Sequence, residues 1–192
     1  GNVLNRWDPA LFLDSHTHNG SYHQEPVTWT WGLNPNGDPD ILAYMAEVML
    51  PAITARMRDE HGVATIPHGD FVDPREPARG WVPLGPQPRY LSNYVGLRNR
   101  LSVLNEQYPY VDYETRVHGA YALFVSFLDH VHAHRDELVA LVRAADRRAI
   151  ERAAREVIAY RESLADADVP PKLRPEAFSP RISETLSEGG AS

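Results

Sequence analysis

Short apolar runs alternate along the chain with stretches of helical periodicity, which is typical of an α/β protein. Residues 10–14 form an apolar run that ends in polar residues and predict a buried strand leading into a loop. Residues 100–108 predict a second strand, with Glu106 near its carboxyl end. A third strand is expected at residues 63–66. The stretch that follows, to residue 88, is rich in Pro and Gly and predicts a long ordered loop.

Helical patterns occupy the rest of the chain. Residues 41–60 predict a helix that is capped by Asp38 or Asp40 and is kinked or broken at Pro51. Residues 136–165 predict one or two long surface helices with Asp136 as a cap. Between these, five apolar residues at helical spacing predict a helix packed against the sheet: Val117, Tyr121, Phe124, Leu128 and Val131. We expect one domain over residues 1–168 and a flexible tail over residues 169–192.

Composition narrows the class of protein. With 192 residues, 43% of them hydrophobic, the chain can bury one core of good size. Its net charge of −7 argues against nucleic acid or an anionic membrane as a partner. No apolar run has the ~20 residues of a membrane-spanning helix. The absence of cysteine excludes disulfides, thiolate zinc sites and cysteine nucleophiles.

Two places carry candidate chemistry. In "LFLDSHTHNGSYH", residues 11–23, His16 and His18 are two apart and would point to the same side of an extended chain, where they could share a metal ion. The alternative is that they are hydrogen-bonding loop residues. Glu106 would be costly to bury without a partner, so it lines a cleft or meets a cation. A salt bridge to Arg98 or Arg100 is the competing interpretation.

Three segments together resemble the C-terminal half of the zinc carboxypeptidases, the carboxypeptidase A-like metallopeptidases, in one of their bacterial branches. They are "DSHTHNGSYH", "LNPNGDPDI" and "RYLSNYVGLRNRLSVLNEQYPYVDYETRV", and the match covers roughly residues 3–128 in the right order. The resemblance implies a mixed sheet flanked by helices, of which this chain holds the C-terminal portion, ending in long helices. It maps the last zinc histidine onto His16 and the catalytic glutamate onto Glu106.

The resemblance implies a hydrolase that removes C-terminal residues from peptides. One Zn²⁺ ion polarises the scissile carbonyl and activates a water, from which Glu106 takes a proton. Tyr22, Tyr94 and Arg98 are weaker candidates for contacts with the peptide substrate. The family usually binds the substrate carboxylate through an arginine that precedes the third histidine. The resemblance also favours a secreted or periplasmic location.

The chain departs from the family in one large respect. The first two zinc ligands of the family form a His-x-x-Glu motif, and here only His134 and Glu137 have that spacing, after His16 rather than before it. We interpret this as a chance match. The remaining ligands are expected upstream of Gly1, in an N-terminal half of the catalytic domain, so this chain alone should bind zinc weakly and be inactive.

Two other classes remain open. "LDSHTH" also satisfies the Asp-x-His-x-His pattern of metal-dependent amidohydrolases and phosphoesterases, in which both histidines bind metal. The chain is short for their (β/α)₈ barrel, typically ~250 residues. A relative of the carboxypeptidases that binds peptides without cleaving them is the third class, and an intact Glu106 argues against it.

Overall fold

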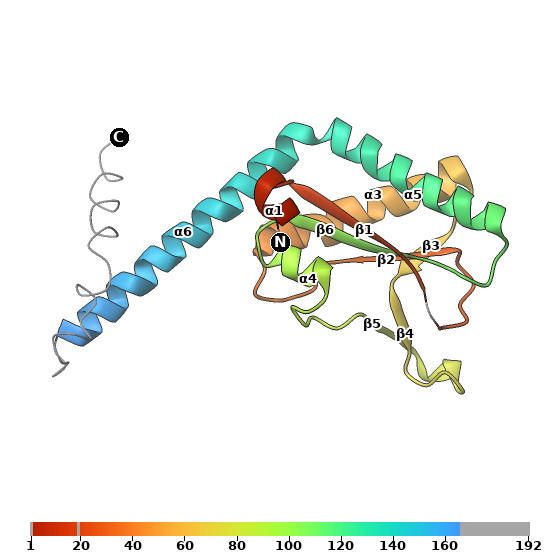
Figure 1. The fold of residues 1–192 in the computed structure, drawn as a ribbon, viewed down its shortest axis with the longest axis horizontal. Helices are drawn as coiled ribbons and strands as arrows, with labels where there is room; N and C mark the ends of the chain where they lie inside the picture. Colours follow the sequence, from red (N-terminus) through yellow and green to blue (C-terminus); the bar gives the residue numbers. More distant parts are fainter. Residues whose placement is uncertain (1, 19, 166–192) are drawn as a thin grey trace. The chain divides into compact units, whose positions relative to one another are not determined.

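The computed structural model describes residues 2–18 and 20–165 (Figure 1). Contacts divide the chain into one unit up to Asp146 and a second from Arg147 onward. The first unit holds the described strands and the helices up to the first part of α6. In the second, the described residues continue α6, a single helix over Arg135–Ala165. The tail expected at residues 169–192 lies outside the described residues.

A four-stranded mixed sheet organises the first unit. A mixed sheet flanked by helices is what the resemblance implies, but the sequence predicted only three strands and missed the one at Val27–Trp31. The strand order is β1 (Leu11–Thr17), β6 (Leu101–Gln107), β2 (Val27–Trp31) and β3 (Thr65–Pro67). β1 and β6 are parallel, β2 is antiparallel to β6, and β3 is parallel to β2. β1 therefore lies at one edge of the sheet. It is longer than the apolar run 10–14 predicts, so His16 lies within the strand rather than after it.

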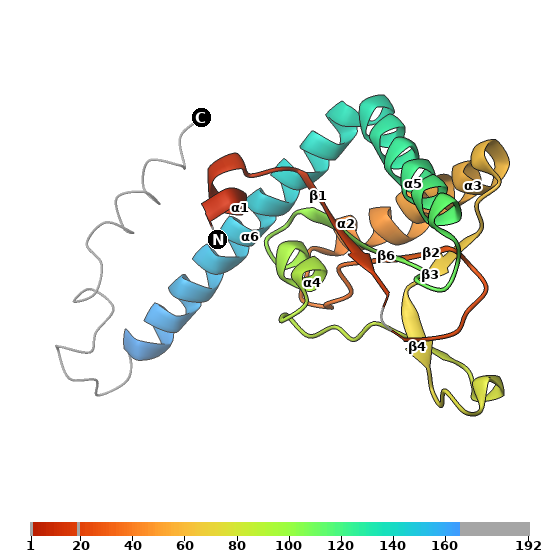
Figure 2. The ribbon, with the colours of Figure 1, turned by 45° about the vertical axis from the view of Figure 1, so that its right-hand side comes forward.

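Helices cover one face of this sheet. The predicted helix over residues 41–60 is α2 (Pro39–Tyr44), a π-helical turn (Met45–Met49) and α3 (Leu50–His61). The Asp38 side chain accepts hydrogen bonds at the start of α2, and Pro51 opens α3 after the π-turn. Figures 1 and 2 both show α3 beside α5 (Tyr113–Ala133) on this side of the sheet. The core contains Val27, Trp29, Met49, Ile53, Met57, Val103, Leu123 and Phe127.

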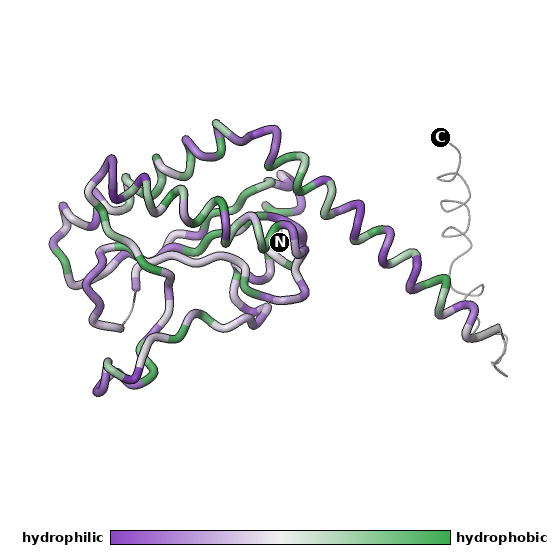
Figure 3. Tube along the Cα trace, turned by 180° about the vertical axis from the view of Figure 1, so that it is seen from behind, coloured by the Kyte–Doolittle hydropathy of each residue, from purple (hydrophilic) through white to green (hydrophobic). Residues whose placement is uncertain are grey.

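The prediction for α5 is wrong about which of its faces meets the sheet. Its buried residues are Gly119, Ala122, Leu123, Ser126, Phe127 and His130. Four of the five residues predicted to pack there are exposed instead: Val117 (50%), Tyr121 (59%), Phe124 (38%) and Leu128 (66%). Figure 3 shows hydrophobic and hydrophilic residues alternating along this helix. Because α5 carries two apolar stripes, periodicity alone did not identify the inward one.

The expected loop between residues 63 and 88 has more structure than its composition indicates. β4 (Gly69–Phe71) and β5 (Trp81–Pro83) pair in an antiparallel hairpin with a 3₁₀ turn (Pro77–Arg79) between them. A Cβ at Gly69 would overlap the Val82 carbonyl, so the close approach of the two strands requires glycine there.

The short helix α4 (Leu91–Gly96) packs against β6, where the Ser102 hydroxyl donates to the Ser92 carbonyl at 2.6 Å. α1 (Asn2–Trp7) precedes β1. Asp136 lies in the first turn of α6 instead of capping it from outside. Among the described residues, no helix combines the length and hydropathy needed to cross a membrane.

Candidate functional site

His16 and Glu106 occupy paired positions in neighbouring parallel strands. The register places His16 of β1 opposite Glu106 of β6, and Thr28 of β2 opposite Glu106 on the other side. Since residues paired across a sheet project to the same face, the three side chains form a polar row across three strands. This face is opposite the one covered by α3 and α5. The two leading candidates from the sequence are therefore adjacent in the structure.

Asp14 positions the His16 ring. One carboxylate oxygen of Asp14 lies 2.9 Å from Nε2 of His16, two residues along the same strand face. Because a carboxylate accepts, Nε2 carries the proton, and in the neutral ring the lone pair is on Nδ1. A metal-binding histidine is commonly held in this way by a carboxylate on its other nitrogen. The His16 side chain is 48% exposed, so Nδ1 of a ring held in this tautomer is a suitable metal ligand.

Glu106 is a carboxyl group held without a cation. Its Oε2 is buried and has no hydrogen-bond partner among the described residues. Burial raises the pKa of Glu106, the charge of Asp14 raises it further, and His16 opposes the shift. A carboxylate with a raised pKa and an unpartnered oxygen accepts a proton more readily than an ordinary surface carboxylate does.

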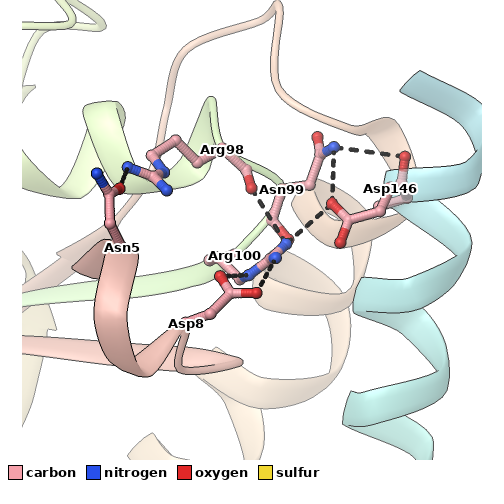
Figure 4. Close-up of polar contacts among 7 residues, drawn as sticks. Asn5, Asp8, Arg98, Asn99, Arg100 and Asp146 are labelled. Atoms are coloured by element: carbon pink, nitrogen blue, oxygen red, sulfur yellow. Dashed lines mark hydrogen bonds and ion pairs between the residues drawn. The ribbon is translucent and has the colours of Figure 1, made fainter. Parts of the chain in front are cut away.

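The arginines considered as partners of Glu106 lie elsewhere. Arg100 donates to Asp8 at 2.8 Å and to Asp146 at 2.9 Å, and Arg98 donates to Asn5 at 2.8 Å (Figure 4). These contacts are at the start of β6, whereas Glu106 is near its end. A salt bridge from Arg98 or Arg100 therefore does not explain Glu106.

His68 stands on the far side of this row. The Thr28 hydroxyl is 3.0 Å from Nδ1 of His68, and both residues are buried. Burial is the main cause that lowers the pKa of His68 to about 4, with smaller contributions from neighbouring histidines that include His18, His23 and His16. His68 is thus a neutral hydrogen-bonding residue at pH 7.

The loop after β1 fixes the role of His18. The Gly20 amide donates to Nδ1 of His18 at 3.0 Å, so the proton of the neutral ring is on Nε2, which lies 3.2 Å from the Ser21 hydroxyl. The Ser21 hydroxyl in turn lies 3.0 Å from Nδ1 of His23. Both ring nitrogens of His18 are engaged and neither offers a lone pair to a metal. This arrangement does not favour the Asp-x-His-x-His class, and the four-stranded sheet among the described residues is not a (β/α)₈ barrel.

Tyrosines gather where β1 and β6 end. Tyr22 stacks on Tyr110 with ring centroids 4.6 Å apart, and both are exposed. Tyr110 also contacts Tyr108, which packs against His23 at 4.4 Å. Tyr22 therefore belongs to an aromatic surface next to the strand ends that carry His16 and Glu106.

Two candidates from the sequence are not part of this site. Tyr94 and Arg98 contact each other at 3.3 Å, near α1 and the start of β6. At ~3.3 Å per strand residue, the start of β6 is roughly 17 Å from Glu106. His134 and Glu137 contact each other at 2.9 Å between α5 and α6, both with exposed side chains.

The residues fit one side of a zinc site. His16 offers a nitrogen with its tautomer fixed by Asp14, and Glu106 stands beside it as a free carboxyl. Among residues 2–18 and 20–165, no three His, Asp or Glu side chains are placed to hold one metal ion. The sequence reasoning missed Asp14 and His68 as neighbours of the site. Asp14 had a signal, since residues two apart in a strand share a face, whereas His68 lies 40 residues from Thr28.

Comparison with known proteins gives no relative: no family model, no curated protein and no solved structure matches the chain.

Proposed function

We propose that this chain is the part of a zinc-dependent metallocarboxypeptidase that carries one zinc ligand, His16, and the general base, Glu106. The observation that carries the proposal is their juxtaposition on one sheet face, with His16 oriented by Asp14 and Glu106 free of any arginine. The resemblance of the sequence segments supports the family. A secreted or periplasmic location belongs to the same proposal.

Each residue has a defined part in peptide hydrolysis. Zn²⁺, when bound, supplies a polarised carbonyl and a more acidic water. Glu106 accepts the proton of the attacking water and passes it to the departing amine, for which its raised pKa is suited. Asp14 keeps the proton of His16 on Nε2, so the lone pair of Nδ1 would be available to hold the metal. Tyr22, stacked on Tyr110, is available to contact the peptide, and Tyr94 and Arg98 lie too far from Glu106 for that role.

The remaining zinc ligands and the carboxylate-binding arginine belong, in this proposal, to a further polypeptide segment, the N-terminal half of the catalytic domain. The 192-residue chain should then bind zinc weakly and leave peptides intact. The product of the complete gene should bind one zinc and release C-terminal residues from peptides with a free carboxylate, but not from peptides with a blocked C-terminus.

Metal content and peptide hydrolysis test this directly, on the 192-residue chain and on the complete gene product. In the latter, His16→Ala should lose zinc, whereas Glu106→Gln should keep zinc and lose turnover by roughly 10²-fold or more. If the 192-residue chain bound one zinc ion tightly and hydrolysed peptides, the proposal that the remaining zinc ligands lie on a further segment would be contradicted. Equal cleavage of free and blocked peptides would contradict a carboxypeptidase.

A further inference from the structure

Helix α5 presents apolar side chains on two opposite faces. One face packs on the sheet through Ala122, Leu123 and Phe127. The other, which we call the outer stripe, consists of Val117, Tyr121, Phe124 and Leu128, which are 38–66% exposed. A helix that is apolar on both sides is normally packed between two layers. The described part of the chain supplies only one of these layers.

Strand β1 lies beside this stripe at the open edge of the sheet. Its seven residues pair with β6 on one side only. Isolated proteins protect such an edge with proline, lysine or a covering element, and "LFLDSHT" contains neither proline nor lysine. Leu11 and Leu13 are only partly buried. The backbone of β1 is thus available to pair with one more strand.

A groove of about 370 Å³ joins the edge strand to the outer stripe. Residues from β1, α5 and the start of α6 line it, including Leu11, Leu13, Phe124, Leu128 and Val139. Almost all of its lining is apolar. Edge, groove and stripe therefore form one continuous surface within the first unit of the chain.

The candidate zinc site is incomplete and includes a residue of this same edge strand, on the sheet face opposite the one that α5 covers. His16 belongs to β1, and no third metal-binding side chain joins it among the described residues. In a strand paired with the open edge, a side chain opposite His16 would have its Cβ within roughly 4.5–5.5 Å of that of His16. A segment that covers the edge is therefore placed to supply ligands.

We propose that the open edge of β1 and the outer stripe of α5 dock a strand and a helix of the polypeptide that supplies the missing zinc ligands. The strand extends the sheet beyond β1, and the helix packs its apolar side on Phe124 and Leu128. This inference rests on the proposed function for the identity of the occupant. The observations of two apolar faces on α5 and of an unpaired edge at β1 do not depend on the proposed function.

Site-specific labelling tests the docking surface, because the chain has no cysteine of its own. Leu128→Cys places a thiol on the outer stripe, and Val82→Cys, at a residue 48% exposed on β5, is the matched control. In the 192-residue chain both thiols should react with a maleimide at similar rates, and light scattering should give the mass of a monomer. In the complete gene product, reaction at Leu128→Cys should slow at least tenfold while that at Val82→Cys is unchanged.

Two outcomes would overturn this inference. Equal labelling of both cysteines in the complete gene product would show that nothing covers the stripe. Protection of Leu128→Cys in the 192-residue chain, together with a doubled mass, would assign the surface to a second copy. Zinc content measured on the same samples separates the two proposals. Protection of Leu128→Cys in a complete gene product that holds no zinc would support docking and contradict the metallopeptidase. Bound zinc without protection of Leu128→Cys would support the metallopeptidase and contradict docking.

Discussion

His16 and Glu106 are directly paired in register between two parallel strands, so their side chains leave the same sheet face about one strand spacing apart. Thr28 follows on the next strand and is bonded to His68. The polar row that results places a basic and an acidic group side by side next to an unpaired strand edge. The consequences for stability and pH dependence can be measured on the chain as it stands.

Glu106 should make the folded state less stable as pH rises. The pKa of Glu106 in the folded state is raised above the ordinary value of 4.5, chiefly by burial. At pH values between 4.5 and this folded-state pKa, the folded state therefore holds a proton that the unfolded state has lost. Stability is therefore lost as pH rises through the folded pKa. Glu106→Gln should remove this loss, so the free energy of unfolding of the variant relative to the original chain should increase from pH 4 to pH 8.

Urea unfolding at several pH values measures that difference. Asp40→Asn is a matched control, because Asp40 is an exposed residue in the first turn of α2, away from the site. If the difference between Glu106→Gln and the original chain were independent of pH, Glu106 would not titrate above its ordinary range.

His68 should destabilise the fold in acid. Its pKa is lowered from 6.5 to about 4, mainly by burial, so as pH falls through this interval the unfolded state takes up a proton that the folded state refuses. Stability is then fully present above pH 6.5 and is lost toward pH 4, by about 3 kcal/mol.

His68→Gln keeps a hydrogen-bonding side chain beside Thr28 and should flatten the pH dependence over this interval. Urea unfolding at pH 7 and pH 4.5 would detect it. The prediction fails if the variant and the original chain lose the same stability between these two pH values. Proton NMR of His68 should also show no titration above pH 5.

The strand of Glu106 was predicted from local pattern, and the mixed sheet was implied by the resemblance. Pro51 was expected to kink or break its helix, whereas the chain stays helical there and a π-helical turn ends just before it. The sequence did not predict the face of α5, since Val117 and Leu128 are as regularly spaced as the buried residues. Only the tertiary structure distinguishes a stripe that meets the sheet from one left open. The β4–β5 hairpin was missed because its strands have three residues each and lie in a segment rich in Pro and Gly.

Part of the candidate site could likewise be predicted from the sequence, and part could not. His16 and Glu106 were found through the resemblance of motifs, and their adjacency then followed from strand register. The contacts of Arg98 and Arg100 were beyond sequence reasoning, because their partners Asn5, Asp8 and Asp146 are more than 40 residues away. A charged residue near a motif cannot be assigned to it without knowing which end of the strand it occupies.

Arg100 should contribute much more to stability than Arg98. The Arg100 side chain is 13% exposed and bridges Asp8 and Asp146, whereas Arg98 makes exposed contacts with Asn5 and Tyr94. Arg100→Ala leaves two carboxylates near each other without a cation and should cost about 2–4 kcal/mol. Arg98→Ala should cost less than about 1 kcal/mol. Urea unfolding of both variants gives the comparison, and equal losses would contradict the bridging role of Arg100.

The contact between α5 and β2 should be limited by size at Gly119. A Cβ there would lie 2.7 Å from Cγ2 of Val27, which is fully buried in β2 and cannot turn aside freely. Gly119→Ala therefore combines an overpacking cost of about 1–3 kcal/mol with a gain in helix propensity of about 1 kcal/mol.

Val27→Ala alone removes buried methyl groups and leaves a cavity. In the double variant the added methyl group occupies the space that Val27 vacates, so the combined loss should be smaller than the sum of the single losses by at least about 1 kcal/mol. Urea unfolding of the four proteins in this cycle measures the coupling, and strict additivity would show that α5 does not approach β2 at Gly119.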